Sequence, residues 1–306
     1  MILVRQNSSY TKELGEAMSW TSIDQDLCTQ CGICVTRCLM NYKEVEGVIT
    51  SSASLATCNL CGHCVALCPT GAITHHKMDM ENFADLDKGV AYDFDGFTSF
   101  VRGRRSHRIF EDKAVPREHL GKLVDICRYA PTGSNRQTVE ITILQDRDKI
   151  QRLSDHTVDF FENRIDELEK EAREYEAAGK DLPQTTRSAL TMVETLKRVV
   201  MARKFGMEVI FHRAPVVMLF HSPTETSTPK DDCVIASTTV SLAARTLSLE
   251  TTYIGLFEFV ANRYPPIVRE LDLPPGHKVF SILVLGYPKL EFLRAVDRKP
   301  MKARWL

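Results

Sequence analysis

The sequence predicts an α+β protein with a small cysteine-rich domain followed by a larger domain in which a few central strands are covered by helices. Two observations lead to this expectation. Eight of the ten cysteines fall within residues 28–68, in two sets of four. From about residue 99 onward, segments with helical periodicity alternate with short apolar segments typical of strands. The expected parts are an N-terminal arm (1–20), the cysteine domain (21–80), a linker (81–98) and the second domain (99–306).

The composition excludes several classes of protein. Hydrophobic residues make up 43% and charged residues 26% of 306 residues, and the formal net charge is −1. This is ordinary for a soluble domain, and no excess of one charge favours nucleic acid or an anionic membrane. The sequence shows neither a signal peptide nor an apolar run that could span a bilayer. We therefore expect a cytoplasmic protein, in which cysteines serve as ligands or catalysts rather than as disulfides.

The cysteine repeat is the most specific feature of the sequence. Each cysteine of the first set has a counterpart 30 positions later. Three closely spaced thiolates followed by a fourth are typical of a [4Fe–4S] cluster, and in two-cluster arrangements the fourth cysteine ligates the other cluster. One cluster is therefore expected on Cys28, Cys31, Cys34 and Cys68, and the other on Cys58, Cys61, Cys64 and Cys38.

The alternative is a pair of zinc sites. Zinc usually takes two separated C-x2-C pairs around one metal, and here each half has one thiolate too many for that arrangement. The stretch resembles a bacterial two-[4Fe–4S] ferredoxin, with Leu39 where that family often has proline and Pro69 in the matching place of the second half. His63, between two ligands, and the pair His75 and His76 are expected to face solvent.

The second domain is expected to consist of short strands and longer helices. A helix with Pro116 at its first position carries Leu120, Leu123 and Cys127 on one face. The further expectations are a strand at 138–144, helices over 149–205 with a break at 179–183, a strand at 216–220, a loop at 222–232, a helix at 232–249, and strands at 252–255 and 279–285. The apolar side of the 232–249 helix is expected to contain Ile235, Thr239, Leu242 and Thr246.

Residues 102–110, RGRRSHRIF, form a basic segment ahead of a helical one. Such a run is usually a solvated face. Guanidinium groups, the Ser106 hydroxyl and free backbone donors are, however, the components of a phosphate site.

The order of several short motifs carries a resemblance. RRSHRIF is followed by YAPTGSNRQ, by the helix from Asp232 that leads to TTYIG, by LGYP and by RKP. This succession resembles the FMN-dependent nitroreductase family over about residues 99–306. The resemblance implies a mixed or antiparallel sheet covered by helices, and an obligate homodimer with two FMN sites at its interface.

The resemblance also implies residue roles. The FMN phosphate and flavin edge would be held by Arg104, Arg105, Ser106 and Arg108, with Arg298 and Lys299 near the C-terminus. The segment that approaches the flavin from the partner subunit would contain Pro131, Thr132, Gly133, Ser134, Asn135 and Gln137. Ile254 and Gly255 match the turn whose backbone N–H faces flavin N5.

Three functions are compatible with the motifs and the resemblance. The first is a reductase in which an external low-potential donor such as ferredoxin reduces the clusters, the clusters reduce FMN, and FMN reduces a nitroaromatic or quinone-like acceptor. The second is an NAD(P)H-fed flavoenzyme whose clusters carry electrons onward, or one with other flavin chemistry such as dehalogenation. The third is a redox sensor or electron carrier without its own substrate.

Two roles are considered for each of three further features, namely residues 149–205, Cys127 and Cys233. Residues 149–205 are read as a helical insertion, which is either a lid over the active site or an arm that embraces a dimer partner. Cys127 and Cys233 are expected to be structural rather than redox-active thiols.

Overall fold

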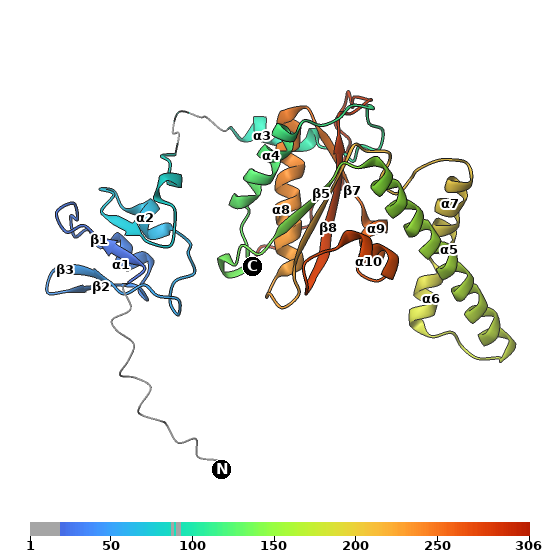
Figure 1. Cartoon of the computed structure of the whole chain (residues 1–306), viewed down its shortest axis with the longest axis horizontal. Helices are drawn as coiled ribbons and strands as arrows, with labels where there is room; N and C mark the ends of the chain where they lie inside the picture. Colours follow the sequence, from blue (N-terminus) through green and yellow to red (C-terminus); the bar gives the residue numbers. More distant parts are fainter. Residues whose placement is uncertain (1–18, 87–88, 90–92) are drawn as a thin grey trace, which may run out of the picture. The chain divides into compact units, whose positions relative to one another are not determined.

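The computed structural model describes residues 19–86, 89 and 93–306. Most of the predicted N-terminal arm lies outside these residues. The chain divides into two compact units, Met1–Ala91 and Tyr92–Leu306 (Figure 1). No helix in the described parts of either unit is long and apolar enough to cross a membrane.

Unit 1 is a two-fold repeated arrangement of short strands and short helices. Strand β1 (Thr21–Ile23) pairs antiparallel with β4 (Ile73–His75), and β2 (Tyr42–Val45) pairs antiparallel with β3 (Val48–Ser51). Helices α1 (Ile33–Arg37) and α2 (His63–Leu67) begin 30 residues apart, as the cysteine sets do. The apolar core is small and is built around Cys34, Tyr42, Ile49 and Ile73.

The predicted linker, residues 81–98, contains more helix than expected. A 3-10 turn, η1 (Met80–Asn82), and the first turns of α3 (Phe94–Gly103) both lie within residues 81–98 or at their edge. The Asp93 carboxylate caps α3 by accepting from the backbone N–H of Gly96, a local signal that the linker prediction overlooked.

Unit 2 is organised on one antiparallel sheet with the order β5-β6-β8-β7. Its strands are β5 (Glu140–Leu144), β6 (Val216–Pro223), β7 (Glu250–Tyr253) and β8 (His277–Gly286). β6 and β8 are buried along nearly their whole length, because helices cover both faces of the sheet. The predicted α+β class, with a helix-covered antiparallel sheet, is confirmed.

Alternating residues of β6 point into two different cores. Val216, Met218 and Phe220 pack with α4 (Arg117–Ile126) and α8 (Pro229–Ala243), while Val217 and Leu219 pack with the helices on the other face. Those helices are α5 (Arg147–Ala177), α9 (Gly255–Ala261) and α10 (Pro265–Leu271), and α7 (Val193–Lys204) packs against α5. The domain is thus a three-layer sandwich, and Figure 1 shows α8 beside the strands. Pro116 is the N-cap of α4 rather than its first helical residue.

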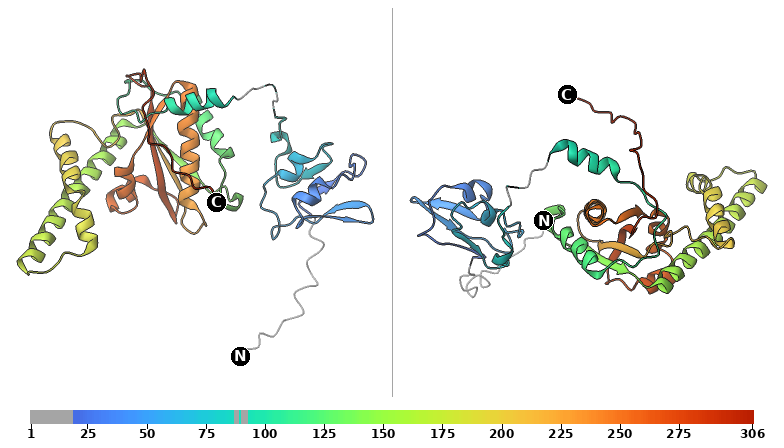
Figure 2. Two further views of the ribbon diagram at one scale, coloured as in Figure 1. Left: turned by 180° about the vertical axis from the view of Figure 1, so that it is seen from behind. Right: turned by 90° about the horizontal axis from the view of Figure 1, so that it is seen from above.

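The long helix α5 extends well past the sheet. Its 31 residues correspond to about 46 Å. α6 (Gln184–Leu190) and α7 return along it, so the three helices form an arm that projects from the sandwich (Figure 2). The chain reverses at Gly179, whose φ of 61° is readily adopted by glycine, within the predicted break.

The prediction for the buried face of α8 was wrong. The helix ends at Ala243 and continues as a 3-10 turn, η4 (Ala244–Leu247), and its buried residues include Cys233, Ala236 and Val240. Ile235 is 37% exposed. Most residues that face the sheet are small, with Val240 the largest of them, and Val234 and Ile235 lie on the outer side.

Candidate functional site

The two cysteine loops have the same backbone conformation. Gln30 and Gly32 in the first loop, and Leu60 and Gly62 in the second, all have positive φ. Gly32 and Gly62 are the residues that immediately precede α1 and α2. Alternation between left-handed and right-handed residues turns successive backbone N–H groups toward one side, which forms an anion-binding concavity of the kind found at iron–sulfur sites.

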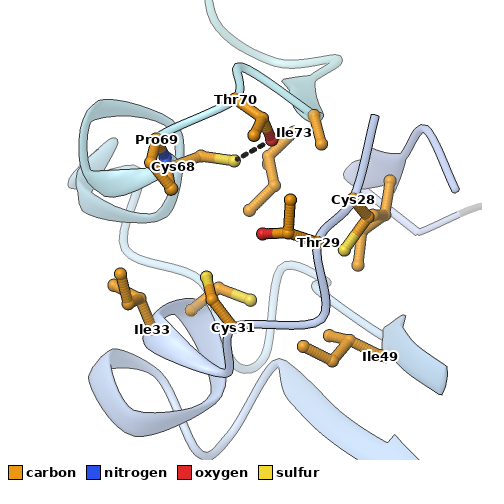
Figure 3. A pocket seen from close by; sticks show the side chains of 12 residues that line it. Cys28, Thr29, Cys31, Ile33, Ile49, Cys68, Pro69, Thr70 and Ile73 are labelled. Carbon is orange, nitrogen blue, oxygen red and sulfur yellow. Dashed lines mark hydrogen bonds between the residues drawn. The ribbon is translucent and has the colours of Figure 1, made fainter. Parts of the chain in front are cut away.

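Four cysteines from both halves of the repeat line one small cavity. Its lining includes Cys28, Cys31 and Cys34 of the first set together with Cys68 of the second. Figure 3 shows the labelled side chains of Cys28, Cys31 and Cys68 around this space, approached from separate segments of the chain. This is the crossed grouping that the spacing predicts. Apolar neighbours such as Ile33, Ile49 and Ile73 close the cavity.

The other four cysteines are also drawn together. Burial and the nearby thiols of Cys58 and Cys61 are among the causes that raise the pKa of Cys64. Cys38 is brought to this group by Asn41, whose Nδ2 donates to Cys38 Sγ at 3.2 Å and to the carbonyl of Thr57, the neighbour of Cys58, at 3.3 Å.

The histidines near the cysteines do not all face solvent. His76 and His63 are exposed, although His63 Nδ1 contacts the guanidinium of Arg37. His75 is only 1% exposed, and its Nε2 lies 3.5 Å from Cys58 Sγ. The expectation for His75 was wrong because pairing of β1 with β4 turns its side chain inward.

In unit 2, the basic segment runs beside strand β7. Ser106 forms a parallel bridge with Thr251, and the His107 backbone N–H donates to the Thr251 carbonyl at 3.1 Å. The hydroxyl of Thr252 donates to the His107 carbonyl. Arg245, which sequence reasoning did not identify, binds Glu250 at 3.0 Å and the carbonyl of Phe100, and so holds α3 at the start of this strand.

Three arginines converge at this place without a carboxylate partner. Desolvation and, after it, the nearby charges of Arg298 and Arg104 lower the pKa of Arg105. Within the described residues no ion pair involves Arg104, Arg105 or Arg298, and Arg105 Nε is buried without a hydrogen-bond partner. A group of cations with an unsatisfied donor is a site prepared for an anion, and a phosphate suits the guanidinium geometry.

The turn after β7 supplies backbone donors. Ile254 is buried and Gly255 exposed, and α9 begins at Gly255, so the first N–H groups of this helix have no intrahelical acceptor. A Cβ added at Gly255 would meet nothing within 4 Å, which indicates open space in front of this backbone.

The predicted segment 131–137 lies elsewhere in the unit. The Gly133 N–H donates to Asp232 Oδ1 at 3.0 Å, which ties the segment to the start of α8. Ser134, Asn135 and Gln137 have positive φ. The segment leads into β5, whereas the basic segment borders β7. These strands are the two opposite edges of the four-stranded sheet, roughly 14 Å apart.

The surroundings of the two cysteines outside the repeat disfavour the reactive thiolate form. Burial raises the pKa of Cys127 to about 11. Burial and the neighbouring Asp232 raise the pKa of Cys233 to about 12. Neither thiol forms a thiolate readily near neutral pH, in agreement with a structural role.

Comparison with known proteins finds relatives of both the cysteine domain and the larger domain. The model of the nitroreductase family matches residues 101–287, more than half of the chain. An Archaeoglobus fulgidus protein, named as an NADH dehydrogenase/NAD(P)H nitroreductase, is 22% identical over 201 residues, covering 64% of this chain and 88% of that protein. A ferredoxin from Methanocaldococcus jannaschii is 41% identical over 54 residues, covering 17% of this chain and 87% of the ferredoxin. A BluB-like flavoprotein from Clostridium difficile superposes with a TM-score of 0.50 at 16% identity, covering 67% of this chain and 94% of that chain.

The chain belongs to the nitroreductase family. It carries a ferredoxin-like domain ahead of the nitroreductase domain, and this combination defines an oxidoreductase.

Proposed function

We propose that this chain is an iron–sulfur flavoprotein that passes electrons through two [4Fe–4S] clusters to FMN and on to an electron-poor small molecule, such as a nitroaromatic or a quinone-like compound. The observation that carries the proposal is the presence, in one nitroreductase chain, of three arginines without acidic partners and of a cavity lined by four cysteines from both halves of the repeat.

The FMN phosphate is assigned to the arginine group. Arg104, Arg105 and Arg298 supply the charge, and the unsatisfied Nε of Arg105 supplies a donor that no protein acceptor uses. Ser106, Arg108 and Lys299 are neighbouring contacts in the proposal. Bound FMN would accept electrons singly and release them in pairs.

The flavin ring is assigned to the turn after β7. The backbone N–H of Gly255 is the proposed donor to flavin N5, with Ile254 beside it. Ser106 and this turn both adjoin β7, so the phosphate and ring contacts follow one strand.

A second copy of the chain is proposed to complete each flavin site. The segment with Pro131, Thr132, Gly133, Ser134, Asn135 and Gln137 borders β5, at the far edge of the sheet from the arginine group. It therefore serves the flavin of the partner subunit in this proposal. The outer side of α8, where Val234 is 39% and Ile235 is 37% exposed, supports such a contact between copies.

The clusters are assigned crosswise. Cys28, Cys31, Cys34 and Cys68 hold one, and Cys58, Cys61, Cys64 and Cys38 hold the other. Shared ligands from both halves stabilise a unit whose apolar core is small.

An external low-potential donor is the proposed source of electrons. The second candidate is an NAD(P)H-fed enzyme, which the name of the Archaeoglobus fulgidus relative favours. The third is a redox sensor or carrier, which would lack a small-molecule acceptor.

Flavin binding tests the arginine assignment. Arg105→Gln should weaken FMN binding by roughly 10- to 100-fold, because one charge-assisted contact contributes about 1.5–3 kcal/mol. The control is Arg128→Gln, an exposed arginine whose carboxylate partner lies three residues away on the chain. Equal flavin affinity in both variants would show that the phosphate binds elsewhere.

Electron entry is tested under anaerobic conditions. Flavin bleaching is followed with reduced ferredoxin, NADH or NADPH as the only donor, in the unaltered protein and in Cys61→Ala. We expect ferredoxin-driven bleaching to be lost in the variant. Rapid bleaching by NAD(P)H in the variant would support the second candidate, and reduced flavin that no nitro or quinone compound reoxidises would support the third.

A further inference from the structure

Because the cysteine domain is an internal repeat, the surroundings of the cysteines in one half can be compared residue by residue with those in the other half. Residues 30 positions apart occupy equivalent places, as the matched pairs α1 and α2, or Gly32 and Gly62, show. Polar side chains that contact the cysteines are not matched in this way. Asn41, Tyr42 and His75 correspond to Gly71, Ala72 and Val45.

His75 donates a hydrogen bond to Cys58. The backbone N–H of Lys77 donates to His75 Nδ1 at 3.2 Å, so Nδ1 is the acceptor nitrogen of the ring. The proton of the neutral ring is then on Nε2, which lies 3.5 Å from Cys58 Sγ. This contact is shielded from water, since His75 is 1% exposed.

Asn41 donates to Cys38 in the same manner. Its Nδ2 contacts both Cys38 Sγ and the carbonyl of Thr57. A carbonyl can only accept, so this contact identifies the NH2 end of the amide and excludes the flipped orientation. Asn41 is 3% exposed.

Tyr42 adds a third donor at Cys64. Its side chain is 2% exposed and packs with Cys64 in the small core of unit 1. A tyrosine hydroxyl carries a proton that it can donate. A buried O–H beside a thiolate is available to a cluster sulfur.

The other set of cysteines has fewer buried side-chain donors, and at Cys68 the hydrogen bonds come mainly from the backbone N–H groups of Thr70, Ala72 and Ile73. Among the described residues, the side-chain contact found there joins Thr70 Oγ1 to Cys68 Sγ at 3.7 Å, and Thr70 is exposed (Figure 3). Gly71, Ala72 and Val45 have no polar side-chain hydrogen to offer. Exposure separates the sets at one matched pair, because Cys34 is buried and Cys64 is half-buried, whereas Cys31 and its counterpart Cys61 are both exposed.

We infer that the two clusters are electronically unequal, and that the cluster on Cys38, Cys58, Cys61 and Cys64 has the higher reduction potential. Hydrogen bonds to thiolate sulfur stabilise the more negative, reduced cluster. The first electron from a low-potential one-electron donor converts this cluster from [4Fe–4S]2+ to [4Fe–4S]+, with no bond formed or broken. The cluster on Cys28, Cys31, Cys34 and Cys68 is reduced second.

The inference rests on the proposed two-cluster function, and its test separates the two. The anaerobic holoprotein is titrated with a low-potential reductant and followed by electron paramagnetic resonance, after iron and sulfide analysis. Two clusters per chain and two resolved one-electron steps are expected. Fewer than two clusters would overturn both proposals, whereas two clusters that titrate together would overturn the inequality alone.

Three variants assign the steps. His75→Leu and Asn41→Leu each remove one donor and should shift the higher-potential step downward, toward the lower one. The matched control, Thr70→Val, should move the lower-potential step and leave the higher one in place. Two leucine variants are used because, if one variant loses a cluster, the other variant still tests the assignment. A higher-potential step unmoved in a leucine variant that retains both clusters, or moved by Thr70→Val, would overturn the assignment.

Discussion

Gly133 lies where the packing leaves no room for a side chain. An added Cβ would come within 2.1 Å of Thr228 Oγ1 and 3.3 Å of Ser227 Oγ. Thr228 cannot turn away freely, because its hydroxyl donates to Asp232 Oδ1 at 3.0 Å. The same carboxylate oxygen accepts from the Gly133 N–H, so the three residues form one small network.

Gly133→Ala should therefore lower the free energy of unfolding by about 1–3 kcal/mol, the usual cost of overpacking. Gly121→Ala is the matched control, because Gly121 lies within helix α4 and an added Cβ there meets nothing within 4 Å. The control should be neutral or stabilising by up to about 1 kcal/mol. Urea unfolding of both variants measures the difference, and similar stabilities would show that the Thr228 loop yields without cost.

At the scale of elements, Glu208 joins helix α5 to the loop that precedes β6. Its Oε1 accepts from the N–H groups of Ile210 and Phe211 at 2.9 and 2.8 Å and from the Ser154 hydroxyl at 2.7 Å. Its Oε2 accepts from the Arg213 N–H at 2.8 Å. Both oxygens thus act only as acceptors.

Glu208→Gln should destabilise unit 2 by about 1–3 kcal/mol, since an NH2 group must then face at least one backbone N–H. The exposed Glu291→Gln provides the control. Thermal unfolding monitored by near-ultraviolet circular dichroism reports the difference. An unchanged midpoint for Glu208→Gln would mean that the 208–213 loop contributes little to the docking of α5.

At the scale of the whole molecule, several histidines are held neutral by burial. Desolvation is the largest cause that lowers the pKa of His107, His212 and His221. In the unfolded chain these rings titrate near pH 6.5. Below that pH the unfolded state binds protons that the folded state excludes, so stability present above about pH 6.5 is lost as the pH falls toward the lower folded-state pKa values.

Urea unfolding at about pH 7.5 and about pH 5.5 should therefore give a lower free energy of unfolding at the acidic value, above the range in which most carboxylates titrate. His221→Gln should reduce this pH dependence. An equal slope for the unaltered protein and the variant would contradict a contribution from His221.

The two units should respond differently to loss of metal. The core of unit 1 is small, and a domain of about 60 residues is marginal without additional cross-links. Chelation of iron is expected to remove hydrogen-exchange protection from β1 and β4 while β6 and β8 keep theirs. Retained protection in unit 1 would show that its apolar core suffices without clusters.

The sequence by itself determined the features that depend on local spacing. The cysteine repeat places thiols and glycines at equal intervals, and the structure has equal loops there. Helical and strand periods located α4, α5, β6 and β8 well, because those patterns report which face of an element is buried. The order of short motifs led to the family that comparison confirms.

Only the tertiary structure decided which residues from distant segments meet. It buries His75 beside Cys58 and brings Arg245 to the carbonyl of Phe100. It also leaves Ile235 on the outer side of α8, because Cys233, Ala236 and Val240 occupy the face that packs on the sheet. Such contacts depend on how strands pair and how helices pack. Pairing and packing involve segments that are far apart in the chain, so the pattern within one segment does not determine them.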